Sequence, residues 1–158
     1  MDLNYTTLYQ LSDADLHIVF NQIVSEDLAD SLFYDKEINA ADFVGFIRNH
    51  TMFILIGDGE ETLSACWLTD FKDNLAYIHY VSFKASKGRA VYIAKEGFKW
   101  LKRHFPTLNV VMGLTPANNN KAIQFYKHLN FTELGKVPNS ITLKDSSVID
   151  GYLTYKEL

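Results

Sequence analysis

The segment from Lys84 to Arg89 holds the residue types that best fit the binding of an anion. Its three cations are Lys84, Lys87 and Arg89, with Gly88 between the last two. An amphipathic helical pattern begins at Ala90. A turn from a strand into a helix directs several unpaired backbone N–H groups and the positive end of the helix toward one point, which favours a phosphate or pyrophosphate. The segment does not match the Walker A pattern of nucleoside triphosphatases. A solvated basic loop is the alternative interpretation, because one glycine and three cations form a weak motif.

His79 is the second candidate for chemistry. It lies in the run from Leu75 to Phe83, which is rich in aromatic and branched residues and predicts a long strand. Alternation along a strand places Leu75, Tyr77 and His79 on one face. A neutral imidazole can accept a proton near pH 7, whereas the alternative is a histidine that packs in the sheet with its ring hydrogen-bonded.

Other reactive residue types lack a supporting pattern. The remaining histidines do not have the spacing of metal ligands, so no metal is expected. Cys66 lies in a strand pattern with no adjacent base visible in the sequence, which favours a buried and inert thiol. No serine lies in a nucleophile-elbow motif, and a serine hydrolase is therefore unsupported.

The first half of the chain predicts two capped helices and a meander of strands. Ser12 with Asp15, and Asn39 with Asp42, precede apolar residues at helical spacing. The expected helices cover residues 13–24 and 39–48, and the connector between them contains a short helix near residues 26–32. The expected strands cover residues 52–56, 62–69 and 75–83, with an Asp-Gly hairpin turn after the first strand.

The second half predicts a helix, a strand, a helix and two final strands. The first helix runs from Ala90 to just before Pro106, a buried strand covers residues 108–114, and Pro116 with residues 118–120 introduces the second helix. Asn130 stands where that helix would end in a left-handed residue, a position that glycine prefers and asparagine tolerates. The final strands are expected at residues 131–137 and 149–156.

This order of elements resembles the GNAT superfamily of acyl-CoA-dependent N-acyltransferases over nearly the whole chain. In the family's pyrophosphate loop, Gln or Arg is followed three residues later by Gly and five residues later by Gly or Ala. Gly88 and Ala90 match the last two positions, whereas Ala85 departs from the first. A register that begins at Lys87 would place Lys95 at a position for an apolar helix residue, so we prefer the first register.

A second family motif has the pattern Asn-x-x-Ala-x-x-x-Tyr-x-x-Leu-Gly-Phe. The matching residues in this chain are Asn119, Ala122, Tyr126, Leu129 and Phe131. Asn130 replaces the glycine, and asparagine can take the same backbone conformation at some cost.

The resemblance implies an α+β fold of three layers in a single domain that covers residues 1–158. Its central sheet would be mixed and mostly antiparallel, with about six or seven strands flanked by helices and a split between the fourth and fifth strands. In the family, pantetheine fits this split as a pseudo-strand. The backbone groups of Val81 and Phe83 are therefore expected to hold the acyl carbonyl and the pantetheine amides.

The resemblance further implies an enzyme that transfers an acetyl group from acetyl-CoA to a primary amine by direct attack in a ternary complex. The cofactor-binding residues of the loop and helix would be Ser86, Lys87, Gly88, Arg89, Ala90 and Asn119. The phenol of Tyr126, with an ordinary pKa near 10, would protonate the leaving thiolate, and packing on the apolar helix face is its alternative role. His79 would act as the base, directly or through water, because Leu75 occupies the position at which many relatives carry Glu or His.

The acceptor amine is expected between the N-terminal connector and the last hairpin, where Tyr34, Glu37 and Tyr152 are the candidate substrate-binding residues. A carboxylate there would attract a cationic amine, although ordinary surface charge is the alternative. Ala85 and Leu75 support a second hypothesis, a catalytically inactive module of the same fold that binds acyl-CoA or another protein. The protein is expected to be a monomer or a homodimer.

The composition fits one globular domain and argues against several classes of protein. Of the 158 residues, 47% are hydrophobic and 22% are charged. The net charge of −4 argues against a general electrostatic grip on nucleic acid. The longest apolar run, Met52 to Ile56, is far shorter than the roughly 20 residues of a membrane-spanning helix. A single cysteine and the lack of a secretory signal pattern lead us to expect a cytoplasmic protein.

Overall fold

Side-chain caps define the start of two N-terminal helices in the computed structural model, which describes residues 2–158. At α1 (Asp13–Ser25), the Ser12 N–H donates to the Asp15 carboxylate at 2.7 Å and the Asp15 N–H donates to the Ser12 hydroxyl at 3.1 Å. Asn39 and Asp42 form the same reciprocal pair at α3 (Ala40–His50). Both predicted helix starts are confirmed, and the short helix α2 (Ala29–Leu32) lies in the connector between them.

Strands form a single seven-stranded sheet in the order β1-β2-β3-β4-β5-β7-β6. Their bounds are Asn4–Thr7, Met52–Gly57, Thr62–Lys72, Leu75–Ser82, Val110–Pro116, Thr132–Thr142 and Val148–Glu157, for β1 to β7 in chain order. The strand β1 was not predicted, because its four residues are too few to show a period. The strand β6 is longer than predicted, since this outer strand is polar and extends by pairing with β7.

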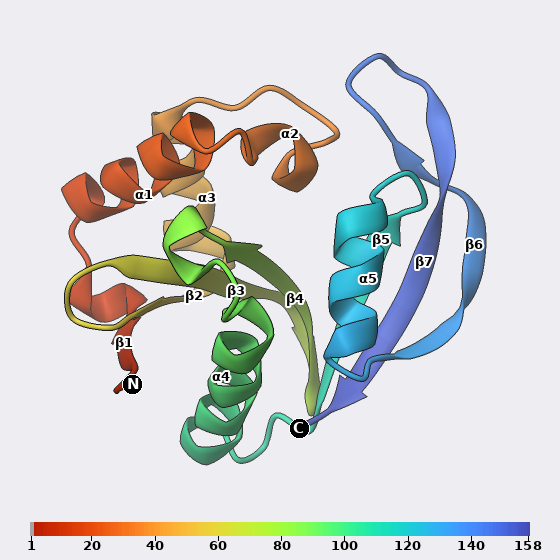
Figure 1. Cartoon of the computed structure of the whole chain (residues 1–158). Coiled ribbons are helices and arrows are strands. Elements are labelled where there is room, and N and C mark those ends of the chain that lie inside the picture. The colour runs from red at the N-terminus through yellow and green to blue at the C-terminus, as the bar shows by residue number, and fades with distance from the viewer. Residues whose placement is uncertain (1) are drawn as a thin grey trace.

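The predicted split between the fourth and fifth strands is confirmed. All neighbouring strands are antiparallel except β4 and β5, which are parallel and pair only where Leu75 to Tyr77 face Val110 to Met112. Beyond these residues the two strands diverge, and β5, β6 and β7 turn away from the rest of the sheet (Figure 1). The divergence leaves one edge of the distal half of β4 without a strand partner.

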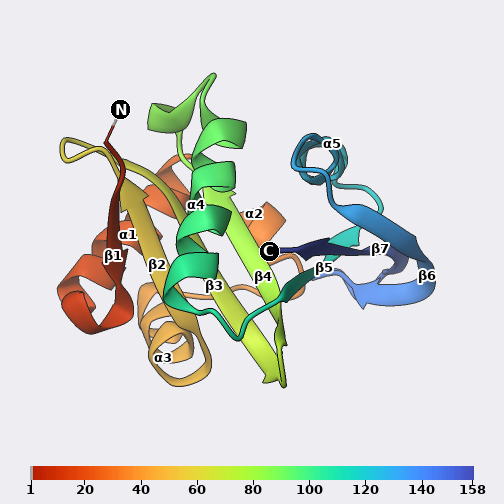
Figure 2. The ribbon, with the colours of Figure 1, turned by 90° about the horizontal axis from the view of Figure 1, so that it is seen from below.

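Helices cover both faces of the sheet. The helix α4 (Ala90–His104) packs on one face of β2 to β4, and α1 and α3 pack on the opposite face (Figure 2). The helix α5 (Asn120–His128) covers β5 on the same side as α4, across the split. Each face has its own apolar core, one built around Phe43 and Trp67 and the other around Ile93 and Leu101.

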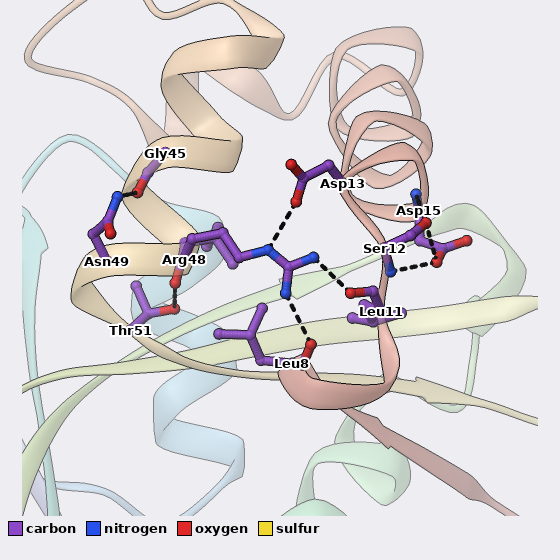
Figure 3. A network of polar contacts seen from close by, with 10 residues as sticks. Leu8, Leu11, Ser12, Asp13, Asp15, Gly45, Arg48, Asn49 and Thr51 are labelled. Atoms are coloured by element: carbon purple, nitrogen blue, oxygen red, sulfur yellow. Dashed lines mark hydrogen bonds and ion pairs between the residues drawn. The ribbon is translucent and has the colours of Figure 1, made fainter.

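A single arginine connects α3 to the segment that precedes α1. Arg48 donates to the Asp13 carboxylate at 2.9 Å and to the backbone carbonyl oxygens of Leu8 and Leu11 (Figure 3). These contacts use its planar fork of donors, which lysine lacks. The guanidinium is therefore directed toward the α1 side of α3.

Two turn residues have positive φ angles, and the sequence predicts this conformation for Asn130. Gly88 and Asn130 have φ angles of 78° and 59°, in the left-handed region.

Within residues 2–158, none of the helices combines the length and the apolar character required to cross a membrane.

Candidate functional site

Strand parity decides which backbone groups of β4 face the split. The Phe83 N–H donates to the Leu63 carbonyl of β3 at 3.0 Å, whereas the Asn74 carbonyl accepts from Asn109 and Val110, which lead into β5. Because successive residues of a strand direct their backbone groups to opposite sides, residues 78, 80 and 82 direct theirs toward the split.

The prediction that the Phe83 backbone holds pantetheine is therefore wrong for its N–H, which is already bonded to β3. Val81 has the same parity as Phe83, although it lines the cavity described next. Tyr80 and Ser82 present the open backbone edge instead. Sequence reasoning missed them because the edge that faces β3 and the edge that faces β5 can be told apart only when the register of both neighbours is known.

A cavity of about 460 Å³ occupies the split, and we call it the split cavity. Its walls come from α2 and its flanking residues, the distal half of β4, the end of β5 and the first two turns of α5. The wall residues used below are Tyr34, His79, Tyr80, Val81, Ser82, Ala90, Asn119, Ala122 and Phe125. The cavity thus collects residues from five elements, namely α2, β4, α4, β5 and α5.

The loop predicted to bind an anion stands at the rim of the split cavity. A 3-10 turn at Lys84–Ser86 leads to Gly88, and α4 begins at Ala90, which lines the cavity. A Cβ atom built on Gly88 would meet nothing within 4 Å, so the space above this backbone is open. The first N–H groups of α4 have no partner within their own helix, and this helix end is positive. The rim can therefore accept a phosphate group.

Two of the predicted cofactor-binding residues, Ser86 and Arg89, form hydrogen bonds within the loop. The Ser86 hydroxyl is buried and lies 2.7 Å from the Phe83 carbonyl and 2.5 Å from the Ser82 hydroxyl. Arg89 donates to the Ala85 carbonyl at 2.8 Å, and its other terminal nitrogen lies 3.9 Å from Asp58. Both side chains stabilise the turn, and the Lys87 side chain is exposed at its surface.

Glu26 supports the loop from the end of α1. Its carboxylate accepts the Lys84 N–H at 2.6 Å and also accepts from Gln22 at 3.1 Å. This contact joins residues that are 58 positions apart, and no short-range sequence signal could have found it.

The rotation of α5 presents Phe125 to the split cavity. Phe125 stacks on Tyr80, with ring centroids 5.2 Å apart. Asn119 lines the cavity too, but its side-chain oxygen also caps α5 by accepting the Ala122 N–H at 3.1 Å. Phe125 was not predicted as a site residue, because the family motif names its neighbour Tyr126 and only the rotation of α5 decides which of the two faces the cavity.

Tyr126 is buried on the other side of α5, against the outer strands. Its hydroxyl donates to the Glu133 carboxylate of β6 at 3.1 Å, and Tyr126 is not among the residues that line the split cavity. Burial and the nearby Glu133 carboxylate raise the pKa of Tyr126 to about 12. The structure therefore does not place this phenol at the split cavity, although the predicted acceptor residue Tyr152 is close enough to influence its pKa, and its role as the acid stays a prediction.

His79 lies at the base of the split, two residues beyond the last β4–β5 pair. Its Nε2 is 3.2 Å from the Thr69 hydroxyl, and its ring stacks on Trp67. Loss of hydration lowers the pKa of His79 below its ordinary value of 6.5, and the Asp70 carboxylate opposes this shift. The side chain is nevertheless accessible to solvent, so a neutral imidazole is available near pH 7 to accept a proton.

The predicted acceptor residues are only partly brought together. Tyr34 lines the split cavity and an adjoining cavity of about 530 Å³, the hairpin cavity, which also contacts Leu143 and Lys144 of the β6–β7 turn. Glu37 is exposed and forms a salt bridge with Lys144 at 3.0 Å. Tyr152 lies in β7, where it pairs with Thr115 of β5, and it lines neither cavity.

Other candidate chemistry receives no support from the described residues. Cys66 is buried, and desolvation raises its thiol pKa to about 12, as expected for an inert side chain. Among residues 2–158, no three His, Cys, Asp or Glu side chains form a group that could hold a metal ion.

No protein-family model and no curated protein matches the chain. Solved structures match over nearly its full length. An acetyl transferase from Salmonella typhimurium that modifies the N-terminal serine of a 50S ribosomal subunit protein has a TM-score of 0.79 and 13% identity, covering 99% of this chain and 95% of that one. Spermidine N-acetyltransferase from Vibrio cholerae, solved with CoA and spermine, has a TM-score of 0.77 and 13% identity, with coverage of 98% and 95%.

An acetyltransferase of the GNAT family from Streptococcus pneumoniae has a TM-score of 0.67 and 15% identity, with coverage of 99% and 100%. The chain therefore has the fold of GNAT acetyltransferases, as its order of elements predicts.

Proposed function

We propose that this protein is an N-acetyltransferase that moves an acetyl group from acetyl-CoA to a primary amine while both are bound. The observation that carries the proposal is the split cavity, in which an unpaired edge of β4 meets the N-terminal end of α4. An extended chain of amides that ends in a pyrophosphate is complementary to both features.

Backbone groups supply most of the proposed grip on the cofactor. Tyr80 and Ser82 would pair with the pantetheine amides, Val81 would contact the same chain, and Gly88 with the first turn of α4 would receive the pyrophosphate. Backbone donors explain how the site could work with Ala85 at the position where the family carries a longer polar side chain. Lys87 would add a mobile positive charge at the rim.

The acyl group arrives as a thioester, which is activated toward attack by a neutral amine. His79 would take the proton that the attacking amine must lose, directly or through water. A nitrogen–carbon bond forms, the carbon–sulfur bond breaks, and the electron pair leaves on the CoA sulfur. That thiolate then takes a proton, for which Tyr126 remains our proposed donor, and this role requires its hydroxyl to leave Glu133.

Of the three residues expected from the sequence to bind the acceptor, only Tyr34 lines the split cavity and the adjoining hairpin cavity. Two observations favour a second candidate, a catalytically inactive acyl-CoA-binding module: Ala85 in the loop and the contact of Tyr126 with Glu133. Both candidates require the split cavity to bind CoA.

A thermal-shift measurement paired with a transfer assay tests the proposal. Acetyl-CoA should raise the Tm, and a panel of primary amines should give free CoA thiol together with an acetylated amine detected by mass spectrometry. A Tm increase without an acetylated product from any amine would favour the inactive module. An unchanged Tm at millimolar acetyl-CoA would contradict both candidates.

A further inference from the structure

A third cavity, which we call the α3 cavity, lies beside the base of the split. It has a volume of about 760 Å³ and is formed by the end of α3, the start of β2, the end of β3 and His79. The wall residues that matter here are Phe46, His50, Thr69, Asp70, Phe71 and His79. None of these residues except His79 belongs to the wall of the split cavity.

The charge in the α3 cavity suits a cation. Within residues 2–158, the Asp70 carboxylate has no hydrogen bond or salt bridge, although it is close enough to influence His79. The negative C-terminal end of α3 borders the same cavity. Arg48 also lines it, but its guanidinium is held by Asp13 and two backbone carbonyls on the α1 side (Figure 3).

Aromatic rings give the α3 cavity an apolar part. Phe71 is 55% exposed, which is unusual for a phenylalanine, and Phe46 is partly buried beside the ring of His50 at 5.9 Å. One exposed ring and one partly buried ring next to an unpaired carboxylate fit an ammonium group attached to an apolar body.

His79 joins this cavity to the proposed chemistry. It lines both the α3 cavity and the split cavity, so a group bound on one side of the imidazole lies next to a group bound on the other side. Thr69 holds Nε2 at 3.2 Å, and Trp67 supports the ring face. The imidazole thus stands where a proton would have to be taken from an amine that approaches the split from the α3 side.

We propose that the α3 cavity binds the acceptor, a primary amine with an apolar or aromatic body, and that Asp70 attracts its ammonium group toward His79. This inference rests on the proposed N-acetyltransferase function. It predicts a route for the acceptor that is distinct from the hairpin cavity.

Direct binding provides the first test, with 2-phenylethylamine as the probe and 2-phenylethanol as its uncharged analogue. NMR titration of the full chain should show amide shifts at Asp70, Phe71 and His79 with the amine, and weaker shifts with the alcohol. Asp70→Asn should weaken amine binding roughly fivefold, because one partly exposed charge pair is lost. Shifts that centre on Tyr34 and Leu143 instead, or no shifts at all, would overturn the proposal.

Asp73→Asn is the matched control for the Asp70 variant. Asp73 is exposed, lies close by in the turn after β3, and has a φ of 53° beside 51° for Asp70, so asparagine replaces aspartate in the same backbone conformation. Asp73 lines neither the α3 cavity nor the split cavity. This control should bind the amine as the wild-type protein does, and equal weakening in both variants would count against a specific site.

Kinetics separate this inference from the proposed function. Asp70→Asn should raise the KM for the amine roughly fivefold and leave the KM for acetyl-CoA unchanged. Acetyl transfer with an unaltered amine KM in this variant would overturn the amine site and leave the proposed function standing. Amine binding in the α3 cavity with no transfer and no acetyl-CoA binding would overturn the proposed function and leave the amine site standing.

Discussion

The imidazole of His79 lies parallel to the indole of Trp67, with ring centroids 5.7 Å apart and ring planes 10° apart. Trp67 is itself held by the rings of Phe43 and Phe53, at 6.3 and 6.0 Å. The orientation of the imidazole is therefore set by an aromatic cluster that α3, β2 and β3 build together. A base that is held in one orientation does not have to be ordered again at each turnover.

Replacement of His79 by glutamine should lower kcat about 100-fold and leave acetyl-CoA binding unchanged, since the proposed general base is removed. In the wild-type protein, His79 accepts a proton only above its own pKa, which lies below 6.5. We therefore expect kcat/KM to fall as the pH drops through that pKa and to be level near pH 7. The variant should lose this acidic limb in a pH–rate profile.

His128→Gln is the control for this substitution, because the ring of His128 bonds to the Gln124 carbonyl on the exposed side of α5. It should keep the wild-type profile. The same acidic limb in His79→Gln would show that another group titrates.

Replacement of Gly88 by glutamate should abolish the Tm increase that acetyl-CoA causes. The new carboxylate would enter the open space above the loop and repel a pyrophosphate. For the wild-type protein, ligand at about 100 times its Kd adds about 2.7 kcal/mol to the free energy of unfolding. Thermal shift with and without acetyl-CoA measures both effects.

Gly135→Glu is the matched control, because Gly135 also has a positive φ, of 151°, and open space around it, but lies on β6 away from the loop. Both variants should lose stability through backbone strain. Only Gly88→Glu should lose the Tm increase that acetyl-CoA causes. A Tm increase that persists in Gly88→Glu would exclude the loop as the pyrophosphate site.

Replacement of Tyr126 by phenylalanine tests the proposed acid. We expect kcat to fall at least about tenfold while the Kd for acetyl-CoA changes little, because protonation of the thiolate is affected and binding is not. Glu133→Gln, which removes the charge that holds the hydroxyl at 3.1 Å, should keep kcat within about twofold of wild type. Equal kcat in Tyr126→Phe and wild type would limit Tyr126 to packing.

Lys144 forms a bridge between the β6–β7 turn and the N-terminal connector. Its Nζ lies 2.7 Å from Asp30 and 3.0 Å from Glu37, and its backbone N–H donates to the backbone carbonyl of Tyr34. Because both carboxylates are largely exposed, Lys144→Met should lower the Tm by no more than about 3 °C, and this difference should shrink at high salt. Thermal unfolding at low and high salt measures it, and a large, salt-independent loss would contradict a surface role.

Sequence reasoning succeeded for features that depend on neighbouring residues. The caps at Ser12 and Asn39, the left-handed Asn130 and the start of α4 at Ala90 all follow from short-range chemistry. It was less successful for side-chain roles at the site. Tyr34 reaches the split cavity, whereas Tyr152 and Tyr126 do not line it.

Taken alone, the sequence determined most of the helices and strands, although not β1, and the left-handed residue Asn130 after α5, whereas the split was expected from the resemblance to the GNAT superfamily. The elements and turns arise from periodicity, caps and turn residues, which are set within a few residues. The tertiary structure decided that Tyr80 and Ser82 face the split, that Phe125 and not Tyr126 meets the cavity, and that His79 borders two cavities. The edge of a strand and the rotation of a helix depend on partners that are distant in the chain, so no local pattern could contain them.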